Sequence, residues 1–178
     1  MATRGTLTET VFIMRRSKSK APLTSPIMLL VFVIICLAAG RLGAAFTEPA
    51  LESWYRDLAK PGWTPPDIVF PVTWSLLFVV MGIAAWLVWK TAERGEARLP
   101  LTLFFGQLVI NVLWSFSFFG QRDPFLGLVN LGALLLAVIL TTIAFSRVSA
   151  VAGWLFLPYL LWLGYAGALN LAIWRMNP

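Results

Sequence analysis

The 178-residue chain contains no histidine, a single cysteine and few charged residues. Without histidine it cannot build a Ser-His-Asp triad, a zinc site of the usual kind or a histidine ligand to haem iron. Cys36 cannot form an internal disulfide, and its apolar surroundings indicate a small packing residue. Charged residues make up 12% of the chain, against about a quarter in soluble domains. We therefore expect no metal site and no water-soluble fold.

Carboxylates are also missing from the long apolar segments. Every Asp and Glu lies in the N-terminal tail, in a connection or at the end of an expected helix. A proton-coupled pump normally keeps an ionisable group within a span, so this composition argues against one. It also leaves no acid–base pair for an ordinary enzyme, and we assign no catalytic residue.

What the chain has instead is long apolar segments. Hydrophobic residues make up 59% of the sequence, and the mean hydropathy is +0.80. Each of five segments is long enough to cross a hydrocarbon core of roughly 30 Å as a helix. The sequence thus predicts an all-α membrane protein, a bundle of five transmembrane helices in a domain spanning 26–178, preceded by a basic, mobile tail at 1–25. The expected helices cover about 26–46, 68–90, 100–120, 124–146 and 149–174, with a lid loop at 47–67.

Basic residues are distributed unevenly between the two sides of the expected bundle. Nine Lys and Arg lie on the side of the N-terminus and four on the opposite side. In a bacterial cell membrane, this bias predicts a cytoplasmic N-terminus. An outer or organelle membrane is the alternative, and there the rule does not apply. The asymmetry and anionic lipids account for the net charge of +6, so we expect no nucleic-acid partner.

Residues 54–78 read WYRDLAKPGWTPPDIVFPVTWSLLF, a proline-rich stretch with three tryptophans that runs into the second apolar segment. Proline fixes φ and removes a backbone donor, so this loop is stiff. Stiff backbone with aromatic planes suits a lid over a flat, apolar ligand. The alternative is an interfacial belt, because tryptophan gathers at headgroup depth in any membrane protein.

Polar residues are rare in the third and fifth segments and share faces with tryptophan. Asn111, Trp114 and Ser115 fall on one face of the third helix. For Gln107, one turn earlier, an interhelical hydrogen bond is the simpler interpretation. On the fifth helix Ala166 leaves room beneath Trp162, and we expect Pro158 to bend the helix. Apolar surfaces with a few convergent polar groups are typical of small-molecule sites.

Three motifs together resemble the TspO/MBR family, the tryptophan-rich sensory proteins related to the mitochondrial translocator protein. They are residues 54–78, the segment NVLWSFSFFG and the segment LPYLLWLGYAGALN, in the family's order and covering most of 27–177. The resemblance implies a five-helix bundle, often dimeric, that binds porphyrins, haem-related tetrapyrroles, sterols and benzodiazepine-site ligands. By motif position, the implied pocket residues are Tyr55, Trp63, Trp74, Asn111, Trp114, Ser115, Trp162 and Ala166.

The resemblance assigns the polar ligand contacts to Trp74 and Asn111, and the lid to Trp63 with its prolines. Two positions depart from the family pattern. Phe78 stands where the family has a tyrosine, and residues 169–175 lack the central tyrosine of the sterol-recognition segment of the animal members. Cholesterol is therefore not the expected natural ligand, although sterols and lipids stay candidate partners.

The expected function is that of a membrane receptor or sensor. It would bind protoporphyrin or a haem-related tetrapyrrole in stress-linked regulation or transport, as a homodimer and without a required cofactor. The alternative is an enzyme-like protein that degrades bound porphyrin under light, with Trp74 and Trp162 as redox-active neighbours of the ligand.

Overall fold

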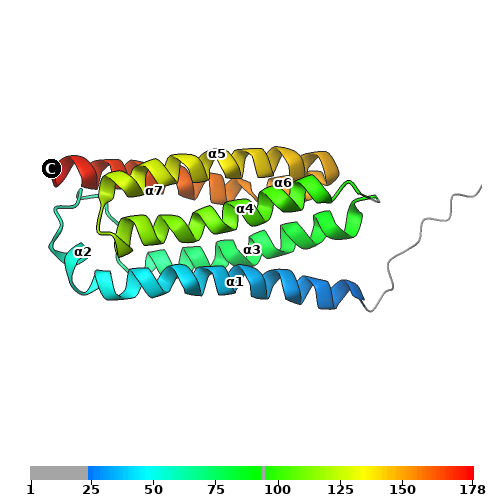
Figure 1. Cartoon of the computed structure of the whole chain (residues 1–178), viewed down its shortest axis with the longest axis horizontal. Coiled ribbons are helices and arrows are strands. Elements are labelled where there is room, and N and C mark those ends of the chain that lie inside the picture. The colour runs from blue at the N-terminus through cyan, green and yellow to red at the C-terminus, as the bar shows by residue number, and fades with distance from the viewer. Residues whose placement is uncertain (1–23, 94) are drawn as a thin grey trace, which may run out of the picture.

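The computed structural model describes residues 24–93 and 95–178, so nearly all of the predicted tail lies outside the described part. The described residues form helices and connecting segments, with no strand among them (Figure 1). The elements are α1 (Thr24–Leu51), α2 (Trp54–Asp57), α3 (Val69–Thr91), α4 (Arg98–Ser115), the π-helix η1 (Phe116–Gly120), α5 (Pro124–Val148), α6 (Ala150–Trp154) and α7 (Leu157–Met176).

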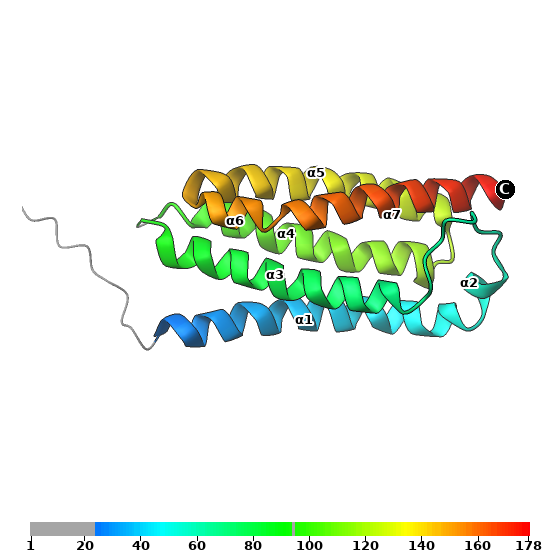
Figure 2. The same cartoon turned by 180° about the vertical axis from the view of Figure 1, so that it is seen from behind.

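Five helical stretches of the described chain are long and apolar enough to cross a membrane. They are Ser25–Leu51, Val69–Thr91, Arg98–Gly120, Pro124–Val148 and Ala150–Met176. The predicted fold class is confirmed, and the chain is a multi-pass integral membrane protein. The long helices lie side by side, with α1 against α3 and α4, and α5 against α4 and α7 (Figures 1 and 2).

The two ends of the bundle differ. At one end of the bundle, α2 and residues 58–68 lie near the C-terminus (Figure 2). We call residues 58–68 the lid and this end of the bundle the lid end. At the far end lie the start of α1 and the short helix α6. The first helix runs five residues beyond its expected end at 46, and α2 forms inside the expected loop 47–67. Ser53 stabilises the turn between α1 and α2, since its hydroxyl donates to the carbonyl of Pro49 at 2.9 Å.

The third and fifth spans are not continuous α-helices. The third ends in η1, where the amide of Gln121 donates to the carbonyl of Phe116 at 2.8 Å. Such π-helical turns are frequent at functional sites. The fifth is broken into α6 and α7, with Pro158 in the first turn of α7. Proline is tolerated at this position because the amide it lacks would have no helical partner there.

Glycine allows α1 and α3 to approach closely. A side chain at Gly82 would lie within 2.8 Å of the backbone of Val33, and one at Gly40 within 2.6 Å of the ring of Phe78. In lipid, close approach of this kind supplies the packing that holds helices together. It also places Phe78 beneath Trp74, the central residue of the site described next.

Candidate functional site

Trp74 lies at the centre of a group of rings from three helices. Its ring centroid is 6.0 Å from that of Trp114 on α4, and 6.0 and 6.5 Å from those of Tyr159 and Trp162 on α7. Phe78 stacks on it at 5.8 Å from within α3. We call Trp74, Trp114, Tyr159 and Trp162 the aromatic cluster. The structure thus brings together three tryptophans that the sequence places far apart.

Two polar atoms of this cluster have no partner. The indole nitrogens of Trp114 and Trp162 are buried and form no hydrogen bond with any described residue. An indole N–H can only donate, and a buried donor left unpaired costs roughly 1–3 kcal/mol. A ligand that carries hydrogen-bond acceptors would remove this cost. The cluster therefore offers apolar ring surface and two free donors.

Asn111 is bonded across the bundle instead of standing free. Its amide nitrogen donates to the Tyr159 hydroxyl at 2.8 Å, and that hydroxyl donates to Oε1 of Gln107 at 3.2 Å. All three side chains are buried. The interhelical hydrogen bond predicted for Gln107 is confirmed. In the structure, the Asn111 side chain holds Tyr159 against Trp74. The amide has a second N–H, so direct contact between Asn111 and a ligand stays a prediction.

The other two predicted residues of these helices lie beside the cluster. Ser115 is buried on the side of α4 that faces α1, where a side chain at Gly43 would lie 3.0 Å from its hydroxyl oxygen. Ala166 is buried one turn after Trp162 and adds no ring or polar contact of its own. Helical spacing placed Ser115 with Trp114 on one face, but neighbouring residues of a face can contact different helices.

Tyr55 on α2 reaches the cluster through one intermediate ring. It contacts Phe118 of η1 at 6.2 Å, and Phe118 stacks on Trp114 at 5.9 Å. Burial raises the pKa of Tyr55 to about 12, and the nearby carboxylate of Asp67 adds to the rise. Its hydroxyl therefore stays protonated at neutral pH, and the ring provides an apolar wall at the lid end.

Trp63 in the lid is half exposed and is also one ring away from the cluster. Its ring lies 5.6 Å from that of Tyr165, which stacks on Trp162 at 5.5 Å. The Tyr165 hydroxyl donates to the Trp63 carbonyl at 3.1 Å. This bond fastens the middle of the lid to α7.

The end of the chain fastens the lid a second time. The Asn177 side chain accepts from the amide of Ala59 at 2.9 Å and donates to the carbonyl of the same residue at 3.0 Å. Its amide nitrogen also donates to the Ile173 carbonyl at 2.7 Å, which orients the side chain on α7. The lid thus closes over the cluster through contacts that span 118 residues of sequence.

Several residues of this arrangement were absent from the predicted set. Helical spacing placed Phe118 on the face of Asn111 and Tyr159 on the face of Trp162, but neither was counted among the pocket residues. Tyr165 and Asn177 gave no such signal, because their partners are backbone groups of the lid.

Neither of two cavities in the described chain is lined by the cluster. One of about 500 Å³ lies at the lid end, and one of about 290 Å³ lies at the far end, among Thr142, Ser146 and Trp154. The rings of the cluster fill their own space, so a planar ligand would have to separate them. Among the described residues, no group of three or more Cys, Asp or Glu side chains could hold a metal ion.

Comparison with known proteins gives consistent matches over most of the chain. The TspO/MBR family model matches residues 32–175. The chain is 42% identical over 145 residues to tryptophan-rich protein TspO of Chlorobaculum tepidum, covering 81% of this chain and 92% of that protein. Identity is 39% over 140 residues with the translocator protein of Homo sapiens, covering 76% and 82%. It is 35% over 150 residues with the tryptophan-rich sensory protein of Cereibacter sphaeroides, covering 84% and 91%.

Proposed function

The chain belongs to the TspO/MBR family, and from that premise we propose that it is a membrane receptor or sensor for tetrapyrroles. Protoporphyrin, a haem-related compound or another flat, apolar molecule binds in the aromatic cluster. Binding serves stress-linked regulation or transport of porphyrins. The names of the relatives, a sensory protein and a translocator protein, support a role in sensing or in movement of a ligand.

The observation that carries this proposal is the pair of unpartnered indole donors, Trp114 and Trp162, beside the ring of Trp74. A tetrapyrrole presents a wide apolar face for stacking and carboxylate side chains that accept hydrogen bonds. Trp74 contributes the stacking surface, and the two indole N–H groups bind acceptor oxygens. Haem iron needs no protein ligand in this arrangement, because ring contact and shape hold the molecule.

Entry of such a ligand exchanges one set of ring contacts for another. Trp74 already contacts three rings of the cluster, so a planar ligand replaces a ring–ring contact with a ring–ligand contact of similar kind. The lid must loosen at Trp63 or Ala59 to admit the ligand, and it can close again through the same hydrogen bonds.

The membrane, the orientation and the assembly belong to the same proposal. The protein lies in a bacterial cell membrane, where the bias of basic residues supports a cytoplasmic N-terminus. A homodimer is supported by Gly164 and Ala168, which are exposed on α7 and offer a small surface for close helix packing. Light scattering of the protein in detergent should then give twice the monomer mass, and a monomer mass would reject the dimer.

Tryptophan fluorescence tests the ligand. Micromolar protoporphyrin should quench the emission of the purified protein, and Trp162→Phe or Trp114→Phe should each weaken binding about tenfold, since each removes one hydrogen bond to a charged acceptor. Trp154→Phe is the matched control, because Trp154 is exposed at the far end and lies outside the cluster. Absence of quenching in the unmodified protein would reject the proposal.

A second candidate is light-dependent degradation of bound porphyrin with dioxygen as the oxidant. It is favoured by a row of oxidisable rings, Trp74, Trp162, Tyr165 and Trp63, that leads from the cluster to the half-exposed lid with centroid spacings of 6.5, 5.5 and 5.6 Å. Illumination with oxygen should bleach bound porphyrin, while a dark sample should not change. If Trp162→Phe leaves the rate of bleaching per bound porphyrin unaltered, the residue has no part in it.

A further inference from the structure

The larger cavity lies outside the aromatic cluster, at the lid end of the bundle. Its volume of about 500 Å³ is within the range of small-molecule sites. Its lining residues come from the end of α1, the turn after it, α2 and the lid: Leu51, Glu52, Tyr55, Arg56, Lys60 and Asp67. Because α1 and α3 are membrane spans, their ends place this cavity at the membrane surface.

The lining carries two acidic and two basic residues, and they are not paired with one another. Glu52 and Asp67 form no salt bridge with a described cation. The guanidinium of Arg56 lies 3.7 Å from the Asp57 carboxylate, and both side chains are about three-quarters exposed, so this pair is weak. The cavity therefore presents two free carboxylates and one guanidinium with donors available.

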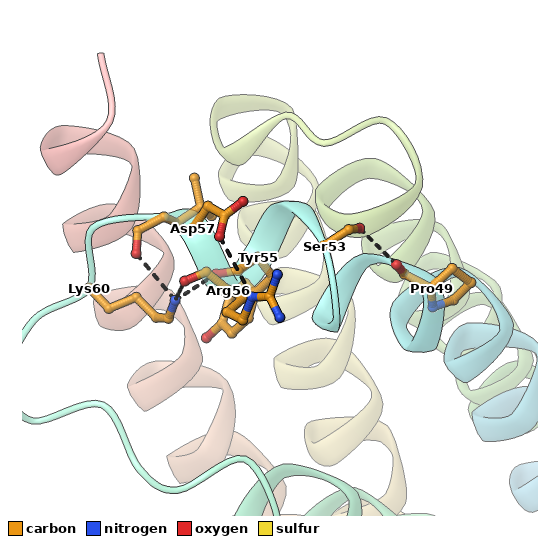
Figure 3. A network of polar contacts seen from close by, with 7 residues as sticks. Pro49, Ser53, Tyr55, Arg56, Asp57 and Lys60 are labelled. Atoms are coloured by element: carbon orange, nitrogen blue, oxygen red, sulfur yellow. Dashed lines mark hydrogen bonds and ion pairs between the residues drawn. The ribbon is translucent and has the colours of Figure 1, made fainter.

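Lys60 is already bound, as Figure 3 shows. Its ammonium donates to the carbonyls of Tyr55, Arg56 and Leu58 at 2.5, 3.1 and 3.2 Å, which uses all three of its donors. It also lies 4.6 Å from the centroid of the Tyr55 ring, the one aromatic ring of this lining. A quaternary ammonium ligand, which binds by stacking on such rings, finds this ring occupied. A primary ammonium can bind the carboxylates by hydrogen bonds instead.

We propose that this cavity binds the headgroup of phosphatidylethanolamine. The ligand's ammonium donates to the carboxylates of Glu52 and Asp67, and its phosphate accepts from the guanidinium of Arg56. A zwitterion suits a lining with two charges of each sign, whereas an anionic headgroup can bind Arg56 through its phosphate but brings no ammonium to pair with the two carboxylates.

The surface of α3 favours a lipid as the source of this zwitterion. An apolar row begins one residue after Asp67: Ile68, Val72 and Leu76 follow at four-residue steps and are 67%, 61% and 63% exposed. A headgroup in the cavity can lay an acyl chain along this row. A soluble phosphoethanolamine compound has the same headgroup chemistry but would gain nothing from it.

Native mass spectrometry of the full chain, with equal amounts of phosphatidylethanolamine, phosphatidylcholine and phosphatidylglycerol in the detergent, tests the proposal. We expect phosphatidylethanolamine to be retained about tenfold over phosphatidylcholine, as charge-assisted hydrogen bonds would give. The double variant Glu52→Gln with Asp67→Asn should remove this preference, and Arg56→Gln should weaken retention of all three lipids. Glu48→Gln is the matched control, because Glu48 lies one turn before Glu52, pairs with Arg41 at 2.7 Å and does not line the cavity.

Two results would overturn the proposal: equal retention of phosphatidylethanolamine and phosphatidylcholine by the unmodified protein, or an unchanged preference in the double variant. A further arm adds soluble glycerophosphoethanolamine. Displacement of the lipid at equal concentration would overturn the assignment to a lipid, and failure to displace it supports that assignment. No tetrapyrrole enters these measurements, so their outcome is independent of porphyrin binding.

Discussion

The bundle contains an aromatic group toward each end, and the two are built from different residues. At the far end, Phe104, Phe145 and Phe156 contact one another with centroids 5.1–6.5 Å apart, and all three are fully buried. Toward the lid, the corresponding place is taken by the aromatic cluster, with two indole N–H groups left unpaired. Phenylalanine fills space without a polar atom to satisfy, so the far group can be optimised for packing alone. Two tryptophans of the other group keep N–H donors that packing leaves unpaired.

The largest expected effect is a difference in the free energy of unfolding between a variant of the phenylalanine group and a variant of the aromatic cluster. Phe156→Ala removes a fully buried ring at the far end and should lower the free energy of unfolding by about 3 kcal/mol. Trp162→Phe keeps a ring and removes an unpaired donor, so its change should stay below about 1 kcal/mol. Reversible unfolding in mixed micelles measures both. An equal loss in the two variants would show that both groups serve packing only.

A smaller effect on stability should show whether Asn111 acts by its hydrogen bond to Tyr159 or by a direct bond to a ligand. Asn111→Ala leaves the Tyr159 hydroxyl without its donor and should cost about 1–2 kcal/mol of stability. It should also reduce the rise in melting temperature caused by protoporphyrin. Tyr159→Phe breaks the same hydrogen bond but keeps the amide. If the two variants lose ligand stabilisation equally, Asn111 acts only by holding Tyr159.

The next effect should be confined to the lid end. Asn177→Ala removes both hydrogen bonds to Ala59 and should destabilise lid closure by about 1 kcal/mol, which is about a fivefold rise in amide exchange there. Hydrogen exchange followed by mass spectrometry can compare peptides covering 58–68 with peptides covering 98–110 at the far end. Equal acceleration in both would contradict a local role for Asn177.

The smallest effect at neutral pH concerns Tyr55. Its folded-state pKa is raised from 10.0 to about 12, so folding favours the neutral phenol. The stability that this preference contributes is fully present below pH 10 and is lost as the pH rises through about 12. Unfolding measured across pH 9–12, with Tyr55→Phe for comparison, should show a steeper loss in the unmodified protein. Identical profiles would contradict burial of the hydroxyl.

How far the sequence predicted the site depended on where each residue's partner lies. Trp74, Trp114 and Trp162 were identified from motif and spacing, and the structure joins them. Ser115 was placed on the face of Trp114, yet it packs toward Gly43 because spacing defines a face and not the helix that covers it. The hydrogen bonds between the Asn177 side chain and the Ala59 backbone could not be predicted from the sequence, since a side chain that binds backbone atoms leaves no recognisable pair of residues.

The sequence by itself determined that the chain spans a membrane, how many helices do so and where the stiff loop lies. These properties depend on the length and hydropathy of single segments and on the local geometry of proline. Only the tertiary structure decided which polar atoms are satisfied: Asn111 is paired with Tyr159, and the indoles of Trp114 and Trp162 are paired with no described residue. The physical reason is that the hydrogen bonds of Asn111 and Tyr159 run between two helices, so the packing of the helices sets the distance between donor and acceptor.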